Sequence, residues 1–200
     1  FFNKQVFKKL GYFDERLVRA QDYEFNRRIL KSGGKIWLNP EIRAIYYNQP
    51  TIRGFFKKQI FKDAPYNVYM WYLAPYTFAY RHAITGVFAT GVIGGVLLSP
   101  FFAIIKIIYI SIMALYLIIS IVSAFQQAKR YKTLKHIFLL PLTFFLFHFL
   151  HGLGIIGGLI KLVTGKSPVQ KFKEPWNGYG KLRIEIKKCL SRFIHFETKK

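Results

Sequence analysis

Acidic residues and cysteines are scarce in this chain of 200 residues. Nine Asp and Glu stand against 31 Lys and Arg, which gives a formal net charge of +22. The single Cys189 excludes an intrachain disulfide and forms no metal-binding set with other cysteines. No recognisable nucleic-acid-reading module accompanies the basic charge, so we expect no nucleic-acid partner.

Charge of either sign is also missing from long stretches of a chain that is 52% hydrophobic. Lys106 is the only charged residue from 82 to 125, and there is none from 137 to 160. About 20 apolar residues suffice for a helix to cross a bilayer. We therefore predict two transmembrane helices within 82–125 and a third hydrophobic segment, transmembrane or re-entrant, at 137–163. Gly86, Gly91, Gly94 and Gly95 would let the first helix pack closely on another.

The basic residues on the two sides of the third segment give conflicting predictions of whether it crosses the membrane. The loop 126–136 has four basic and no acidic residues, and the tail from Lys161 has eleven basic and three acidic residues. The positive-inside rule puts both in the cytoplasm, which a single full crossing forbids. Either the segment is re-entrant or interfacial and broken near His151-Gly152, or the tail lies outside against the rule. The first alternative is slightly favoured.

Two further regions have compositions that suit a membrane surface. Residues 51–81 interleave aromatic rings with Lys and Arg, as expected for an interfacial segment, although an ordinary surface helix pair is the alternative. The basic tail, 164–200, contains apolar residues near helical spacing and can lie along the bilayer.

The pattern of residues 1–50 indicates the end of a separate domain. The chain begins with Phe1 and shows no signal peptide, so we interpret it as a fragment that lacks its N-terminal part. Apolar spacing predicts an amphipathic helix over 22–31 that ends at Gly33. Short strands are expected at 35–38 and 42–47.

The scarce acids gather in this first region, and one of them has two interpretations. Four of the nine acids lie within eleven positions: Asp14, Glu15, Asp22 and Glu24. Surface ion pairs with neighbouring arginines, such as Glu24 with Arg28 one turn on, would explain them structurally. Asp22 stands where a helix begins, so it is either a capping residue or a proton acceptor.

The histidines offer a weaker candidate. His148 and His151 lie three apart in an apolar run, where a packing role and a functional role are equally compatible with the sequence. No Cys or carboxylate joins them, so we predict no metal site.

The segment "VFKKLGYFDERLVRAQDYEFNRRILKSGGKIWLNPEIRAIYY" resembles the closing part of the catalytic domain of family-2 glycosyltransferases, and most closely the membrane-bound succinoglycan-type branch. The segments "FFKKQIFKDAPYNVY", "PYTFAYRH" and "HFLHGLGIIGGL" extend the resemblance to about residue 163. It implies an α/β fold class: 1–50 would be the C-terminal remnant of a GT-A-like nucleotide-sugar transferase domain, followed by an α-helical transmembrane region.

The resemblance also implies an activity and a site. Asp22 occupies the position of the catalytic base, which takes a proton from the acceptor hydroxyl in inverting sugar transfer. The implied substrate-binding residues are Gln21, Glu24, Arg27, Arg28 and Gln59. Many family members have Glu where this chain has Gln21, so the second carboxylate of that motif is missing here.

The expected partners are a nucleotide-sugar donor, a lipid-linked saccharide acceptor and the membrane. A divalent metal, Mg or Mn, would be held by a motif absent from this sequence, so the fragment alone is expected to be inactive. The implied setting is exopolysaccharide or envelope-glycan synthesis at a bacterial plasma membrane, with a multi-pass chain and a cytoplasmic catalytic part. A noncatalytic membrane anchor or interaction subunit is the alternative.

Overall fold

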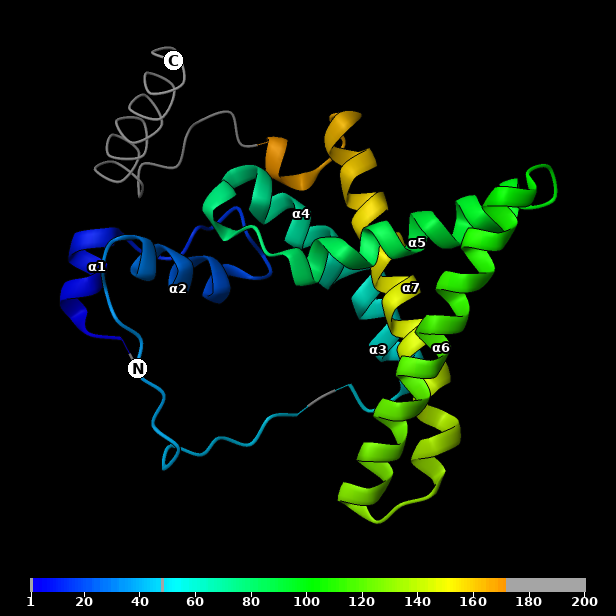
Figure 1. Ribbon diagram of the computed structural model, residues 1–200. Helices are drawn as coiled ribbons and strands as arrows, with labels where there is room; N and C mark the ends of the chain where they lie inside the picture. Colours follow the sequence, from blue (N-terminus) through cyan, green and yellow to red (C-terminus); the bar gives the residue numbers. More distant parts are fainter. Residues whose placement is uncertain (1, 48, 172–200) are drawn as a thin grey trace, which may run out of the picture.

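The computed structural model describes residues 2–47 and 49–171, and these residues are largely helical (Figure 1). The α-helices are α1 (Lys4–Leu10), α2 (Gln21–Lys31), α3 (Ile52–Lys58), α4 (Ala64–Leu73), α5 (Tyr80–Leu98), α6 (Ala103–Tyr131) and α7 (Lys135–Val163). Short helical turns of other types are the π-helical η1 (Gln59–Asp63) and the 3₁₀-helical η2 (Pro75–Thr77) and η3 (Pro168–Lys171). The expected basic tail falls mostly outside the described residues.

The expectation of an α/β domain is wrong, because the described residues contain no strand. The segments expected as strands, 35–38 and 42–47, lie in an extended connection that runs by itself from α2 to α3 (Figure 1). A strand is stabilised when a neighbour pairs with its backbone N–H and C=O groups, and no described segment does so here. The side chains of Trp37, Leu38 and Tyr47 are accordingly 86%, 93% and 87% exposed.

An aromatic cluster joins α1 to α2. Leu10, Phe25 and Ile29 are buried together, and Phe7 and Phe13 pack against them. The rings of Phe7 and Phe25 stack with their centroids 5.2 Å apart. The apolar face predicted for α2 is therefore the face that packs on α1.

The aromatic-basic segment forms a bent helical run, α3–η1–α4, that packs along α7. Its second half is buried, with Val68, Tyr69 and Met70 at most 2% exposed. Two glycines of α7 permit the close approach. A β-carbon at Gly154 would lie 2.7 Å from the carbonyl oxygen of Ile60, and one at Gly158 would lie 2.9 Å from Cα of Pro65.

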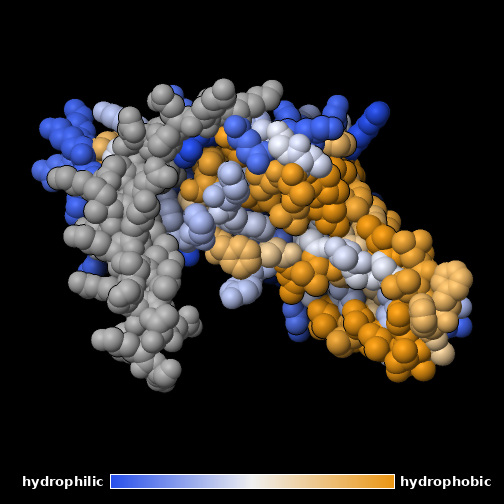
Figure 2. All heavy atoms as spheres, turned by 90° about the horizontal axis from the view of Figure 1, so that it is seen from above, coloured by the Kyte–Doolittle hydropathy of each residue, from blue (hydrophilic) through white to orange (hydrophobic). Residues whose placement is uncertain are grey.

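Three helices, α5, α6 and α7, are long and apolar enough to cross a membrane. Figure 1 shows α6 and α7 side by side, with α5 crossing α7. At most 28% of the most apolar stretch of each span is buried within the protein. Figure 2 shows these hydrophobic side chains gathered over the membrane helices, while hydrophilic residues surround α1 and α2 at the left.

Glycines determine where the membrane helices touch. Gly152 of α7 lies against the backbone of α5, since a β-carbon there would be 2.1 Å from the Thr85 oxygen. Gly86 faces Ile155 and Gly95 faces Tyr109, as their small size predicted. Gly91 and Gly94 have no such neighbour within 4 Å, so only part of the predicted glycine set packs against another helix.

The third hydrophobic segment is one uninterrupted helix. α7 continues through His151-Gly152 and includes Pro141. The expected break near His151 is therefore wrong. The side of the membrane on which each end of α7 lies remains a prediction.

Candidate functional site

The acidic candidate Asp22 lies on α2 in the exposed first turn. The residue before the helix is Ala20, which adopts a left-handed backbone conformation (φ 62°) and forms no side-chain cap. Asp22 therefore does not cap α2.

Glu24 and Arg28 form a buried ion pair, so the interpretation of this pair as a surface contact is wrong. Both side chains are completely buried. Nε of Arg28 donates to Oε1 of Glu24 at 2.9 Å, and Nη2 of Arg28 donates to Oε2 of the same carboxylate. The remaining terminal nitrogen, Nη1, donates to the carbonyl oxygens of Leu10 and Tyr12, at 3.0 and 2.8 Å.

This pair also connects α2 to the segment that leads into the membrane helices. The hydroxyl of Tyr76, in η2, donates to Oε1 of Glu24. The buried Glu24–Arg28 pair thus joins α2 to the end of α1 and the loop after it, through Arg28, and to η2, through Glu24. Sequence reasoning missed Tyr76, because a contact 52 positions away leaves no mark in local spacing.

Asp14 has a structural role in the loop before α2. It is 1% exposed, and its carboxylate accepts from the backbone N–H and from the guanidinium of Arg16 at 2.8 to 3.0 Å. These contacts of Asp14 therefore fix the turn that leads into α2.

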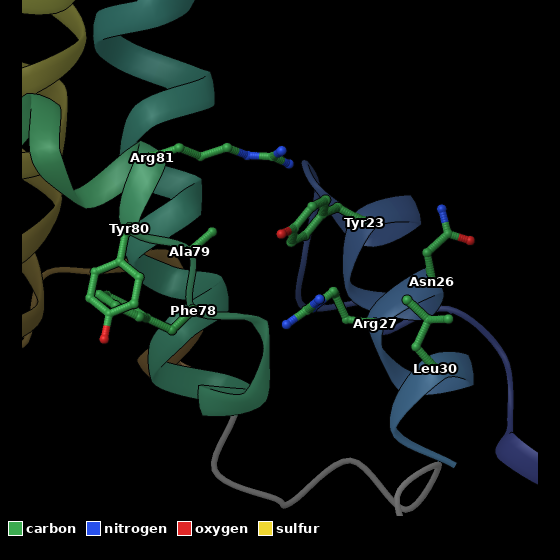
Figure 3. A pocket seen from close by; sticks show the side chains of 8 residues that line it. All are labelled: Tyr23, Asn26, Arg27, Leu30, Phe78, Ala79, Tyr80 and Arg81. Carbon is green, nitrogen blue, oxygen red and sulfur yellow. The ribbon is translucent and has the colours of Figure 1, made fainter. Parts of the chain in front are cut away.

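A cleft of about 500 Å³ lies between α2 and the start of α5. It is lined by Tyr23, Asn26, Arg27, Leu30, Phe78, Ala79, Tyr80 and Arg81. Figure 3 shows Tyr23 and Arg27 of α2 pointing across the cleft toward Arg81 and Phe78. Asp22 is not one of the lining residues; it lies one helical turn before Asn26, which is.

Two arginines face this cleft from different elements. Nη2 of Arg27 donates to the carbonyl oxygen of Tyr76 at 3.4 Å. The guanidinium of Arg81 lies 5.8 Å from the ring centroid of Tyr23, and its Nε lies 3.1 Å from Nε2 of His82. Sequence reasoning named Arg27 as a site residue but not Arg81. In the sequence, Arg81 was marked only by its position directly before the first apolar stretch.

The other predicted substrate-binding residues lie away from this cleft. Gln21 is exposed, and its side-chain amide lies 2.6 Å from the carbonyl oxygen of Leu17. Gln59 lies in η1, where its amide donates to Oδ2 of Asp63 at 3.2 Å. Of the predicted site residues, Arg27 lines the cleft and Asp22 lies exposed on the same helix, while Glu24 and Arg28 lie in the protein interior.

A polar cluster lies deeper, where α4, α5 and α7 meet. Nδ2 of Asn67 is 3.3 Å from Nδ1 of His82 and 3.5 Å from Nε2 of His151. The hydroxyl of Thr85 is 2.8 Å from Nδ1 of His151. His148, on the same helix as His151, instead meets the hydroxyl of Tyr116 at 2.8 Å. The two histidines singled out in the sequence therefore belong to different contacts.

Two tyrosines on α4 are poor proton acceptors. Burial raises the pKa of Tyr66, although the nearby charge of Arg19 lowers it in part. Burial also raises the pKa of Tyr69, and the neighbouring Tyr66 adds to this effect. Both hydroxyls therefore stay protonated at neutral pH.

Within 2–47 and 49–171, no group of three His, Cys, Asp or Glu side chains is arranged to hold a metal ion. The divalent metal expected for the full-length enzyme was assigned to a motif that this sequence lacks. It therefore stays a prediction.

The chain is similar to a known protein of Methanococcus voltae. A dolichyl N-acetyl-alpha-D-glucosaminyl phosphate 3-beta-D-2,3-diacetamido-2,3-dideoxy-beta-D-glucuronosyltransferase of Methanococcus voltae is 29% identical over 152 residues. The match covers 74% of this chain and 42% of that glycosyltransferase. No protein-family model matches the chain, and no solved structure matches it.

Proposed function

We propose that this chain is the membrane-associated part of an inverting glycosyltransferase of family 2. The full protein would move a sugar from a nucleotide-sugar donor to a lipid-linked saccharide during the assembly of an exopolysaccharide or envelope glycan. Similarity to a glycosyltransferase whose name specifies a dolichyl-linked substrate supports both the reaction and the acceptor class. α2 would lie on the cytoplasmic side of the plasma membrane.

The main support for this proposal is the set of contacts that hold α2 against the segment leading into α5. Tyr76 contacts both Glu24 and Arg27, so α2 is fixed beside the segment that enters the first candidate span. An acceptor anchored in the bilayer by its lipid would therefore present its saccharide next to α2. A soluble acceptor would not require this arrangement.

Asp22 can supply the base that the reaction needs. In inverting transfer an acceptor hydroxyl attacks the anomeric carbon, the bond to the nucleoside diphosphate breaks, and the hydroxyl proton passes to a carboxylate. Asp22 is an exposed carboxylate in the first turn of α2, one helical turn before the cleft residue Asn26. General base catalysis of this kind contributes about 10²–10⁴-fold.

Substitution of Asp22 by Asn in the full-length protein tests the assignment. Asn keeps the size of the side chain but loses its basicity, so we expect sugar transfer into membrane lipid to fall by about 10²-fold or more. Folding should be unaffected, because the side chain is exposed and does not cap the helix.

Glu41→Gln is the matched control, since Glu41 is an exposed acid on the connection between α2 and α3. Its transfer rate should equal that of the unaltered protein. An Asp22→Asn protein with full activity would exclude Asp22 as the base. Absence of transfer by the unaltered full-length protein with any nucleotide sugar would instead favour a noncatalytic membrane anchor.

A further inference from the structure

We propose that the cleft between α2 and the start of α5 binds the phosphate group of the lipid-linked acceptor, with Arg27 and Arg81 as its ligands. The inference rests on the proposed function, because it names the part of the acceptor that this site holds. The cleft volume of about 500 Å³ falls within the range of small-molecule sites, roughly 300–1,000 Å³.

The charge of the cleft selects an anion. Its lining residues include two arginines and no acidic residue. Arg27 and Arg81 approach from opposite sides, one from α2 and one from α5, as Figure 3 shows. Planar guanidinium groups form paired hydrogen bonds with phosphate oxygens, so two of them on either side of a cleft suit a phosphate well.

Neither arginine is firmly engaged elsewhere. Arg27 makes one long hydrogen bond, 3.4 Å, to the Tyr76 carbonyl oxygen. Nε of Arg81 and the amide nitrogen of Asn67 approach opposite ring nitrogens of His82, at 3.1 and 3.3 Å. Both are donors, whereas a neutral imidazole accepts at only one nitrogen. Whichever of the two hydrogen bonds His82 accepts, Arg81 engages it only through Nε. The terminal nitrogens of its guanidinium make no hydrogen bond with the described residues and are available to an anion.

The N-terminal end of α5 adds an electrostatic field that favours binding of an anion. Ala79 precedes the helix and its methyl group provides no cap, so the first-turn N–H groups of α5 lack a side-chain acceptor. Ala79 and Tyr80 also line the cleft. The positive end of a 19-residue helix thus adjoins the two guanidinium groups.

The position of the cleft identifies a lipid as the source of the phosphate. Phe78 and Tyr80 line it and are 44% and 83% exposed. Aromatic side chains of this kind are typical of the level at which lipid headgroups meet acyl chains. The apolar surface of α5 begins immediately after Arg81, so a hydrocarbon tail could follow the helix while its phosphate stays between the arginines.

Binding of radiolabelled farnesyl phosphate to the 200-residue chain in detergent micelles tests the proposal. Arg27→Gln and Arg81→Gln should each weaken binding by about tenfold, the usual scale for loss of a hydrogen bond between charged groups. Arg81→Lys should restore only part of the affinity lost in Arg81→Gln, because the charge is kept but the paired hydrogen bonds of the guanidinium are not. Arg130→Gln, in the last turn of α6, is the matched control and should have no effect.

Competition experiments distinguish the sources of the phosphate. Unlabelled farnesyl phosphate should displace the label far better than inorganic phosphate or farnesol. Unchanged affinity in both Arg→Gln variants of the cleft would overturn the proposal. Displacement by inorganic phosphate or by farnesol as effective as by farnesyl phosphate would also overturn it.

Because no sugar is transferred in this assay, its outcome is separate from that of the proposed function. If binding depends on the two arginines but the full-length protein transfers no sugar, the phosphate site is supported and the enzymatic assignment is excluded. Transfer that depends on Asp22, together with binding that is unchanged when Arg27 and Arg81 are substituted, would support the enzymatic assignment and exclude the phosphate site.

Discussion

The Glu24–Arg28 pair shows at the scale of single residues how burial changes the role of a charge. An acid and a base four positions apart on a helix usually form an exposed pair worth about 0.2–0.5 kcal/mol. Here both side chains are fully buried, and the guanidinium also donates to two backbone carbonyl groups. The two charges compensate each other in the interior, so loss of one leaves the other without compensation.

We therefore predict that Glu24→Gln lowers the free energy of unfolding by about 3–5 kcal/mol, the cost typical of breaking a buried ion pair. The substitution retains the shape of the side chain but removes the carboxylate that pairs with the buried charge of Arg28. Chemical unfolding of the chain in detergent micelles, followed by circular dichroism, measures the difference.

Tyr76→Phe separates the hydroxyl contribution from that of the ion pair. It removes one hydrogen bond to the Glu24 carboxylate, so we expect a smaller loss of about 1.5–3 kcal/mol. A Glu24→Gln protein within about 0.5 kcal/mol of the unaltered chain, the range of ordinary surface substitutions, would contradict the role of this pair.

At the scale of elements, glycines decide how closely α7 approaches its neighbours. Gly152 and Gly157 lie on the same helix but in different surroundings. A β-carbon at Gly152 would lie 2.1 Å from the backbone oxygen of Thr85 and 2.6 Å from Cβ of Ala89, whereas nothing lies within 4 Å of the same position at Gly157. One glycine is thus required by packing and the other is not.

This difference predicts opposite effects for the same substitution. Gly152→Ala should destabilise the protein by about 1–3 kcal/mol, because α5 and α7 must move apart to admit the methyl group. Gly157→Ala should be neutral or stabilising by up to about 1 kcal/mol, since Ala favours a helix more than Gly does. Midpoints of thermal unfolding in micelles compare the two variants. A lower midpoint for Gly157→Ala than for Gly152→Ala would refute this account of the packing.

Patterns of neighbouring residues correctly predicted the helices that depend on apolar spacing or on long uncharged stretches. The apolar spacing placed a helix over 22–31, and the structure has α2 at Gln21–Lys31. The uncharged stretches predicted three hydrophobic segments, which correspond to α5, α6 and α7. The strands expected at 35–38 and 42–47 did not form, because alternation of residues indicates a strand only where another strand pairs with it.

The candidate site was less predictable, because its residues come together from separate parts of the chain. Arg27 was identified within a local motif, whereas Arg81 reaches the same cleft from a different helix. Asn67 and His151 are 84 positions apart and meet only because α4 packs on α7. Local spacing also cannot show that Glu24 is buried, since the Tyr76 and Leu10 contacts that enclose it arise from tertiary packing.

At the scale of the whole molecule, charge and apolar surface are separated. The chain has 31 basic residues, yet α5 to α7 expose a broad hydrophobic surface, as Figure 2 shows. The side chains of Phe101, Phe138 and Val163 are 79%, 80% and 87% exposed. An uninterrupted apolar surface of this kind is unfavourable in water and favourable in lipid. Two forces therefore act on the same molecule: attraction of basic residues to anionic headgroups and burial of apolar helices.

These forces respond differently to salt, which leads to the last prediction. At about 1 M salt the Debye length falls to about 3 Å, so surface ion pairs with lipid headgroups are screened. Burial of apolar helices is not weakened by this screening, and we expect the chain to sediment with membranes after a wash at that salt concentration. Neutralising the four basic residues around the turn from α6 to α7, by Gln at Lys129, Arg130, Lys132 and Lys135, should leave sedimentation unchanged, because these charges are not the anchor. Recovery of the unaltered chain in the supernatant after the salt wash would show that charge alone held it, and that α5, α6 and α7 do not span the bilayer.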